Sequence, residues 1–200
     1  MTEEAARISG LYERYADAYD RLRGRSLFER AWLGRFIALL PEPRTVLDLG
    51  CGMGEPMAHY LIGQGCKMTG LDSSAAMIER CRARFPEHLW HVGDMRNFEQ
   101  PEAFSGVLAW DSFFHLTGDD QRKMFSVFKA QAAPGAALMF TSGPSAGEAI
   151  GEFEGEPLYH ASLDPAEYQE LLAANGFEVL SYAAHDPECG GHTVWLARRP

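Results

Sequence analysis

Cysteines, long apolar runs and positive charges are all scarce in this 200-residue sequence. The four cysteines, at positions 51, 66, 81 and 189, form no CxxC pair and no cluster with histidine at zinc-ligand spacing. We therefore expect small buried thiols rather than a disulfide framework, and no metal site. Apolar runs such as "GAALMF" are far shorter than the ~18 residues that a membrane helix needs. The stretch "MTEEAARISG" is polar and acidic, unlike a secretory signal, which favours a cytoplasmic protein without a membrane partner.

Lysine and arginine are outnumbered by acids, and the imbalance is uneven along the chain. The whole sequence has 18 Lys/Arg against 28 Asp/Glu, a net charge of −10. Residues 1–45 have eight basic and seven acidic residues, whereas residues 46–200 have ten and 21. Because an acidic body repels phosphate backbones, a nucleic-acid partner is disfavoured and a neutral or cationic small molecule is favoured. The oligomeric state stays open.

Helix and strand patterns alternate through most of the chain. Apolar residues at helical spacing predict a helix over 5–23. A second helix is predicted from Ser26, where Glu29 completes a capping box, to near Pro41. The next patterns predict strands at 45–49, 67–71, 89–93, 104–110 and 136–143, and helices at 55–64, 74–84 and 118–132, the last announced by Thr117 and Asp120.

The remaining segment is predicted to contain a loop, a helix and two strands. Residues 143–162 are rich in Gly, Pro and Glu and have no period, which indicates a long loop. Asp164 and Pro165 begin a helix that ends at "NG". The strands 177–185 and 192–198 flank the short turn "DPECGG" and should pair antiparallel. The whole pattern predicts one α/β domain whose mostly parallel sheet is covered by helices on both faces.

The stretch "VLDLGCGMGEP" contains the most informative turn. Gly50, Gly52 and Gly54 form G-x-G-x-G, and glycines after a strand let a ligand approach the backbone closely. The dinucleotide fingerprint G-x-G-x-x-G would need its third glycine where Glu55 stands. A carboxylate there competes with a pyrophosphate for the positive end of the helix, which disfavours a nicotinamide oxidoreductase. No Gly-Lys-Ser/Thr follows, so the turn is not a P-loop.

The acids around this turn resemble those of the class I S-adenosylmethionine-dependent methyltransferases. Asp48 lies two residues before the glycines, Asp72 ends the second strand in "TGLDSS", and Asp94 follows the third in "VGDM". A less specific segment, "FSGVLAWDSFFHL", follows the next strand. The resemblance covers residues 44–142 and extends loosely to the carboxyl terminus. The resemblance depends on the three acids together, each at the end of a successive strand, because each acid alone is typical of a helix cap or turn.

The resemblance implies a Rossmann-like, doubly wound sheet of seven strands with an antiparallel carboxyl-terminal strand. Residues 1–40 would form a helical cap acting as a lid, 44–142 the cofactor-binding core, and 143–200 the acceptor side of a single domain. S-adenosyl-L-methionine would be the cofactor and S-adenosyl-L-homocysteine the product. Asp72 would bind the ribose hydroxyls, Asp94 the adenine amino group, and Asp48 with the main chain around Trp110 the methionine ammonium. The implied cofactor-binding residues are Asp48, Gly50, Cys51, Gly52, Gly54, Asp72, Ser73, Asp94, Met95 and Trp110.

The expected activity is methyl transfer to a small-molecule acceptor by in-line displacement, with the acceptor atom left open. The cofactor carries the activated methyl, so a general base is needed only for a protonated acceptor. His115 in "WDSFFHL" is either a base or acceptor-orienting residue, or a packed histidine. This segment lacks the proline pair by which nucleic-acid amino-methyltransferases resemble one another. The candidate acceptor-binding residues are Tyr15, Tyr19, Phe113, His115, Tyr159 and His160.

Two further alternatives remain at this point. The chain could be a non-catalytic methyltransferase-like module that binds the cofactor or a partner. The turn with His185, Asp186 and His192 could contribute to the acceptor site or be only a hairpin tip.

Overall fold

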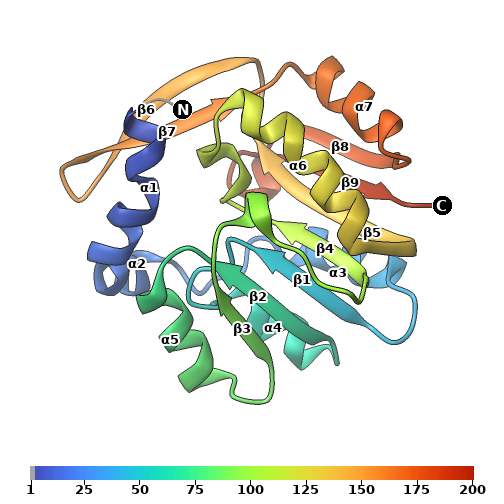
Figure 1. Ribbon diagram of the computed structural model, residues 1–200, viewed down its shortest axis with the longest axis horizontal. Helices are drawn as coiled ribbons and strands as arrows, with labels where there is room; N and C mark the ends of the chain where they lie inside the picture. The colour runs from blue at the N-terminus through green and yellow to red at the C-terminus, as the bar shows by residue number, and fades with distance from the viewer. Residues whose placement is uncertain (1–2) are drawn as a thin grey trace.

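A seven-stranded sheet forms the centre of the computed structural model, which describes residues 3–200 (Figure 1). The strand order is β3-β2-β1-β4-β5-β9-β8. Neighbours from β3 to β5 pair in parallel, whereas β9 pairs antiparallel with both β5 and β8. This confirms the expected fold. The strands are β1 (Thr45–Leu49), β2 (Lys67–Asp72), β3 (Leu89–Val92), β4 (Phe104–Ala109), β5 (Ala132–Ser142), β8 (Glu178–Asp186) and β9 (His192–Arg198).

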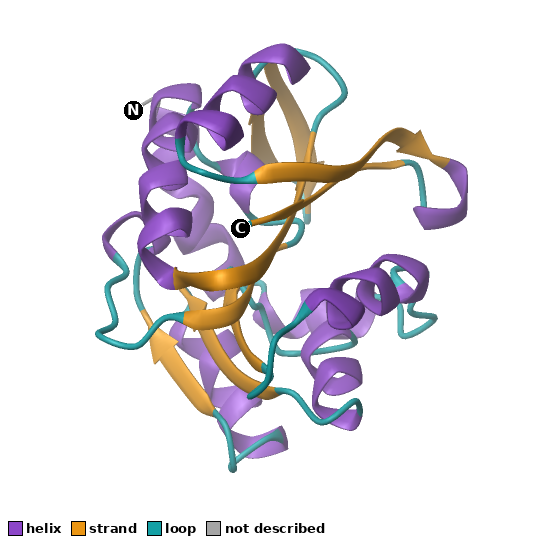
Figure 2. Cartoon of the chain, turned by 90° about the vertical axis from the view of Figure 1, so that its right-hand side faces the viewer, coloured by secondary structure: helices purple, strands orange, loops and turns teal. Residues whose placement is uncertain are grey.

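Helices cover both faces because alternate strand residues point to opposite sides of the sheet. In β1, Val46 packs in one hydrophobic cluster and Leu47 in the other. The first cluster includes α3 (Arg30–Leu39), α4 (Met57–Gly63) and α5 (Ala75–Arg84). The second includes α6 (Gly118–Gln131) and α7 (Pro165–Ala174). Figure 2 shows these helices on either side of the twisted sheet.

Two of the three predicted helix starts are confirmed. Thr117 accepts a hydrogen bond from the Asp120 backbone N–H at 3.3 Å, and Asp164 accepts one from Ala166 at 2.8 Å. The capping box predicted at Ser26 and Glu29 is wrong, because α3 begins only at Arg30. The Glu29 carboxylate is instead buried against the Arg23 guanidinium. A tertiary ion pair thus replaces the local cap.

The amino-terminal helix predicted over 5–23 is interrupted at Tyr15. It forms α1 (Glu3–Arg14) and α2 (Ala16–Leu22), and Tyr15 between them leaves the helical region with φ −109° and ψ 23°. The break lets the Tyr15 hydroxyl donate to Glu156 at 2.9 Å. Residues 1 and 2 of the expected 1–40 cap lie outside the described residues.

The loop predicted over 143–162 is largely a hairpin of β6 (Gly147–Phe153) and β7 (Glu156–Ser162). Its two-residue turn has φ 52° at Glu154 and 81° at Gly155, the left-handed pair that suits a tight hairpin. The pattern was invisible because six of the seven β6 residues are exposed, so no apolar alternation marks the strand. The Phe153 ring lies 6.0–6.2 Å from the rings of three tyrosines on the amino-terminal helices, and α1 runs beside the hairpin (Figure 1).

Replacing Phe140→Ala is expected to lower the free energy of unfolding by about 3–5 kcal/mol. The Phe140 ring is fully buried between Phe113, Tyr168 and Trp195, so truncation leaves a cavity between the sheet and α7. Urea denaturation measures the loss. Leu22→Ala, at a side chain 65% exposed, is the control and should change stability by less than about 0.5 kcal/mol. Equal losses in the two variants would contradict this packing.

Candidate functional site

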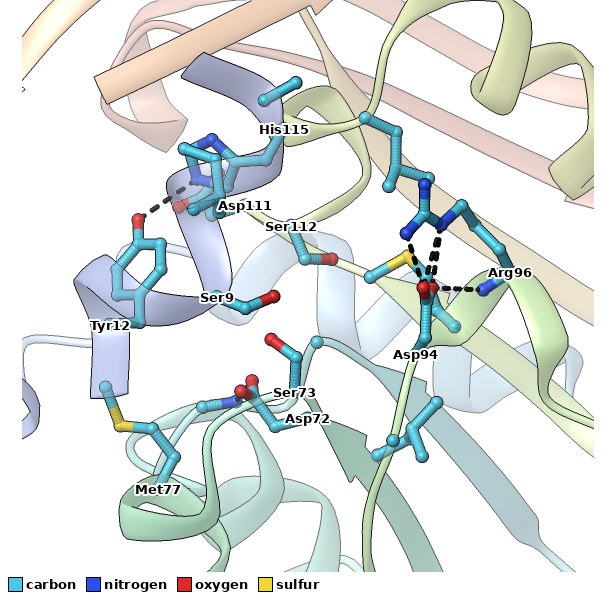
Figure 3. Close-up of a pocket in the computed structure, with 18 of the residues that line it drawn as sticks. Ser9, Tyr12, Asp72, Ser73, Met77, Asp94, Arg96, Asp111, Ser112 and His115 are labelled. Atoms are coloured by element: carbon cyan, nitrogen blue, oxygen red, sulfur yellow. Dashed lines mark hydrogen bonds and ion pairs between the residues drawn. The ribbon is translucent and has the colours of Figure 1, made fainter. Parts of the chain in front are cut away.

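A cleft of about 900 Å³, open to solvent, lies at the carboxyl ends of the strands (Figure 3). The strand order reverses between β1 and β4, which is where ligands bind in open α/β sheets. One wall comes from the segments after β1, β2, β3 and β4, and the opposite wall from α1. The cleft thus joins residues that are far apart in the sequence.

The glycine turn forms the floor of the cleft. Gly50, Gly52 and Gly54 have φ of 81°, 53° and 80°, values that side chains rarely tolerate. A Cβ at Gly50 would lie 2.2 Å from the Ser112 Cβ. The backbone N–H groups of Gly50 and Cys51 donate to the Leu71 carbonyl at 2.7 and 3.0 Å, which ties the turn to β2. These hydrogen bonds hold the turn against β2, where its backbone lines the cleft.

Asp72 lies beside this turn at the end of β2 (Figure 3). Its carboxylate accepts hydrogen bonds from the backbone N–H groups of Gly52 and Ser74, both at 2.9 Å. Burial raises the pKa of Asp72, while these backbone donors act to lower it. A carboxylate has about four lone-pair positions, so further acceptor capacity remains toward the cleft.

Asp48 lies in a smaller chamber that adjoins the cleft and shares Gly50, Gly52, Tyr19 and Asp111 with it. The Asp48 side chain is buried, and burial together with the nearby Asp72 charge raises its pKa to about 7. The same chamber contains Arg23 and Trp110. The Trp110 indole Nε1 is buried without a hydrogen-bond partner among the described residues. A buried, unpaired indole N–H near a buried carboxylate suits a zwitterionic amino-acid group.

Asp94 at the far end of the cleft is already paired. Its carboxylate accepts from the backbone N–H and from Nε of Arg96, both at 2.9 Å. Arg96 also contacts Asp120 at 2.8 Å. The Arg96 hydrogen bonds are the main reason that the pKa of Asp94 is lowered. Any group that binds Asp94 from the cleft must share the carboxylate with this arginine.

His115 and Tyr12 are in contact on one side of the cleft (Figure 3). The His115 Nδ1 lies 2.7 Å from the Tyr159 carbonyl, and because a carbonyl only accepts, this nitrogen carries the proton. Nε2 therefore accepts from the Tyr12 hydroxyl at 3.0 Å. Burial lowers the pKa of His115 to about 4 and raises that of Tyr12, so both are neutral at pH 7.

Residues 46–135 match the family model described as a methyltransferase domain. A dTDP-4-amino-2,3,4,6-tetradeoxy-D-glucose N,N-dimethyltransferase of Saccharopolyspora spinosa is 32% identical over 149 residues, which are 70% of this chain and 59% of that protein. A carboxy-S-adenosyl-L-methionine synthase of Shewanella loihica is 27% identical, over 74% of this chain and 61% of that protein. The chain thus spans less than two thirds of these two relatives.

Solved structures share the fold at lower identity. The amino pentose methyltransferase CalS10 of Micromonospora echinaspora, solved with S-adenosylmethionine, has a TM-score of 0.72 at 21% identity, over 93% of this chain and 96% of that chain. The magnesium protoporphyrin IX methyltransferase of Synechocystis PCC 6803 has a TM-score of 0.74 at 15% identity, over 100% and 99%.

Residues 46–135 thus belong to the methyltransferase-domain family, and the chain has the fold of class I S-adenosylmethionine-dependent methyltransferases. The match agrees with the expected family, enzyme class and cofactor.

The cleft fits the methyltransferase cofactor. Gly50 and Gly52 line it without a side chain, and the acids that follow β2, β3 and β4 are carboxylates rather than the basic side chains that bind phosphates. Within residues 3–200, no group of three His, Cys, Asp or Glu side chains is placed to hold a metal ion, and no helix is long and apolar enough to cross a membrane.

The structure brings only part of the predicted site together. Gly50, Gly52, Asp72, Ser73, Asp94, Met95, His115 and Tyr19 line the main cleft, and Asp48, Cys51 and Trp110 line the adjoining chamber. Gly54 lines neither, since its Cβ position faces the Phe85 ring at 2.8 Å.

Four predicted acceptor-binding residues lie outside the cleft. Phe113 is packed in the core between the sheet and α6, and Tyr15 turns to Glu156. Tyr159 is buried and its hydroxyl donates to Glu148 at 2.8 Å, although its carbonyl orients His115. His160 packs its ring against His115 and lines a separate hollow.

Tyr12, Asp111, Arg96 and Asp120 line the cleft but are absent from the predicted site. Helical spacing puts Tyr12 on one face with Tyr15 and Tyr19, so Tyr12 was detectable as a candidate, but only the break at Tyr15 separates Tyr15 from the other two. Asp111 directly follows the predicted strand 104–110, a position like that of Asp94, whereas no sequence signal marks Arg96 and Asp120.

Asp48→Asn is expected to remove part of the pH dependence of stability. The folded-state pKa of Asp48 is raised from its ordinary 3.8 to about 7, so the folded state binds more protons than the unfolded state between these values. Stability contributed by this group therefore falls as pH rises from about 4 to about 7. Urea denaturation at about pH 5 and about pH 8 should show the wild type losing stability relative to the variant. Asp119→Asn, at a side chain 84% exposed, should behave like the wild type.

Proposed function

We propose that this chain transfers a methyl group from S-adenosylmethionine to a small-molecule acceptor by in-line displacement. The observation that carries this proposal is one shared cleft. It contains the glycine turn, the acids that follow β2 and β3, and, on the opposite side, the Tyr12–His115 pair. A cofactor position and a proton acceptor thus lie within the same space, as a transfer reaction requires.

S-adenosylmethionine supplies a methyl group that its sulfonium already activates. The chain has to orient an acceptor and exclude water, and its own groups supply both. Apolar side chains from both walls line the cleft, among them Ile8 on α1, Leu71 on β2, and Met77 and Met95. Tyr19 lines both the cleft and the adjoining chamber, at the place where the two meet.

The Tyr12–His115 pair can accept a proton from a protonated acceptor. The acceptor's proton passes to the Tyr12 oxygen as the Tyr12 proton passes to His115 Nε2, which leaves Tyr12 neutral and His115 as imidazolium. Because burial lowers the pKa of His115 to about 4, the imidazolium is a strong acid and exists only transiently during the transfer. The neutral tautomer fixed by the Tyr159 carbonyl keeps Nε2 ready to accept again.

An amino group on a small polar molecule is the acceptor that these features support. The first curated relatives are named as N,N-dimethyltransferases of amino sugars. The cleft lining has Asp72, Asp94, Asp111 and Asp120 against Arg96, an acidic balance that suits a basic acceptor rather than an anionic one.

Asp72→Ala is expected to weaken S-adenosylhomocysteine binding by about 10- to 100-fold, because a charge-assisted hydrogen-bond acceptor is lost. Tyr12→Phe should keep that binding and slow turnover about 100-fold, because only the proton path is cut. Calorimetry measures binding. Release of S-adenosylhomocysteine against a panel of amino sugars and other small amines measures turnover.

Tyr182→Phe is the matched control, since Tyr182 lies on β8 and does not line the cleft; it should change neither quantity. Unchanged binding in Asp72→Ala would contradict the proposed cofactor position. Tight binding without turnover of any amine would favour a non-catalytic module.

A further inference from the structure

Asp111 occupies the junction between the main cleft and the chamber that contains Asp48. It follows β4 at the point where the strand order reverses, and it lines both spaces, as Gly50 and Gly52 do. Its φ of 48° is in the left-handed region, which L-residues seldom adopt. The chain therefore holds a carboxylate at this junction in a strained conformation.

His192 holds this carboxylate by a geometry that requires a charged ring. His192 Nδ1 lies 2.7 Å from the Cys189 carbonyl, and Nε2 lies 3.0 and 3.1 Å from the two Asp111 oxygens. Both ring nitrogens thus face acceptors, so both carry protons. Since an imidazole is a stronger base than a carboxylate, the shared proton stays on His192. The pair is an imidazolium and a carboxylate.

The surroundings favour that charged ring and fix its place. The His192 ring lies between the rings of Phe28, at 5.3 Å and 30°, and Trp110, at 5.5 Å and 28°. Aromatic faces on both sides attract a cation. The hydrogen bond to Asp111 is the main reason that the pKa of His192 is raised. The hairpin tip that carries His192 is tied to α3, because the Trp32 indole donates to Asp186 at 2.8 Å.

We propose that Asp111 is the negative charge that faces the methylsulfonium centre of the cofactor, and that His192 is its positioning residue. This inference rests on the proposed function. The cofactor's amino-acid end is assigned to the chamber with Asp48 and its ribose to Asp72, so the sulfonium between them falls at the junction that Asp111 lines. Asp111 is also near enough to the Tyr12–His115 pair to influence the titration of both residues.

The charge at the sulfonium can be tested by comparing three ligands in Asp111→Asn. S-adenosylmethionine carries a cationic sulfonium, sinefungin carries a protonated amine at that position, and S-adenosylhomocysteine is neutral there. All three share the adenosine and the amino-acid end. Calorimetry should show that the variant binds the two cationic ligands about tenfold more weakly, the effect of one charge in a partly solvated cleft, and binds S-adenosylhomocysteine unchanged. Asparagine tolerates a left-handed backbone, so this variant preserves the fold.

His192→Phe tests the positioning role separately. It keeps an aromatic ring between Phe28 and Trp110 but removes the ion pair, so it should also reduce the preference for cationic ligands while S-adenosylhomocysteine still binds. Asp119→Asn, which removes an exposed carboxylate on α6, should leave all three affinities unchanged.

If Asp111→Asn weakens the binding of all three ligands equally, the residue contacts the amino-acid end that they share. If it changes none of the three affinities, the residue does not contact the ligand. Either result overturns the inference. If His192→Phe weakens the binding of all three ligands equally, His192 has only a structural role, and its assignment as the residue that positions Asp111 is overturned. If none of the three ligands binds the wild type, the proposed function itself fails.

Discussion

Mutual repulsion among carboxylates is the constraint on which this cleft depends. Asp48, Asp72, Asp94 and Asp111 all lie at or just beyond the carboxyl ends of neighbouring strands, and burial raises the pKa of Asp48 and of Asp72. Three of them are compensated within the chain: Asp72 by backbone N–H groups, Asp94 by an arginine and Asp111 by a histidine. For Asp48, burial and the neighbouring Asp72 charge raise the pKa to about 7. A cationic ligand would offset the excess of negative charge in this cleft.

The parts of the fold that follow from local patterns could be predicted from the sequence. Buried parallel strands, the glycine turn and the caps at Thr117 and Asp164 each depend on neighbours a few residues away. The β6–β7 hairpin could not, because its strand residues face solvent and its order comes from contacts between Phe153 and the amino-terminal tyrosines. Glu29 likewise satisfies a pattern for a cap but pairs with Arg23.

The strand-end acids proposed to bind the cofactor could be predicted better than the residues proposed to bind the acceptor, because the acids depend on local patterns. Strand-end acids keep their place because the sheet register fixes them. Acceptor-side residues depend on how helices and loops pack: Phe113 turned into the core, and the break at Tyr15 took that ring away from the cleft while Tyr12 stayed in it. Asp111 gained its position from a histidine 81 residues away, a pairing that no local spacing reveals.

The carbonyl that orients His115 belongs to Tyr159 on the β6–β7 hairpin, not to the central sheet. The same hairpin packs against α1, which carries Tyr12, the other member of the pair. Two covering elements thus position the groups of the proposed proton path. The hairpin carries the carbonyl that fixes the His115 tautomer, and α1 carries the Tyr12 hydroxyl. A displacement of α1 would therefore both uncover that side of the cleft and separate the Tyr12 hydroxyl from His115 Nε2.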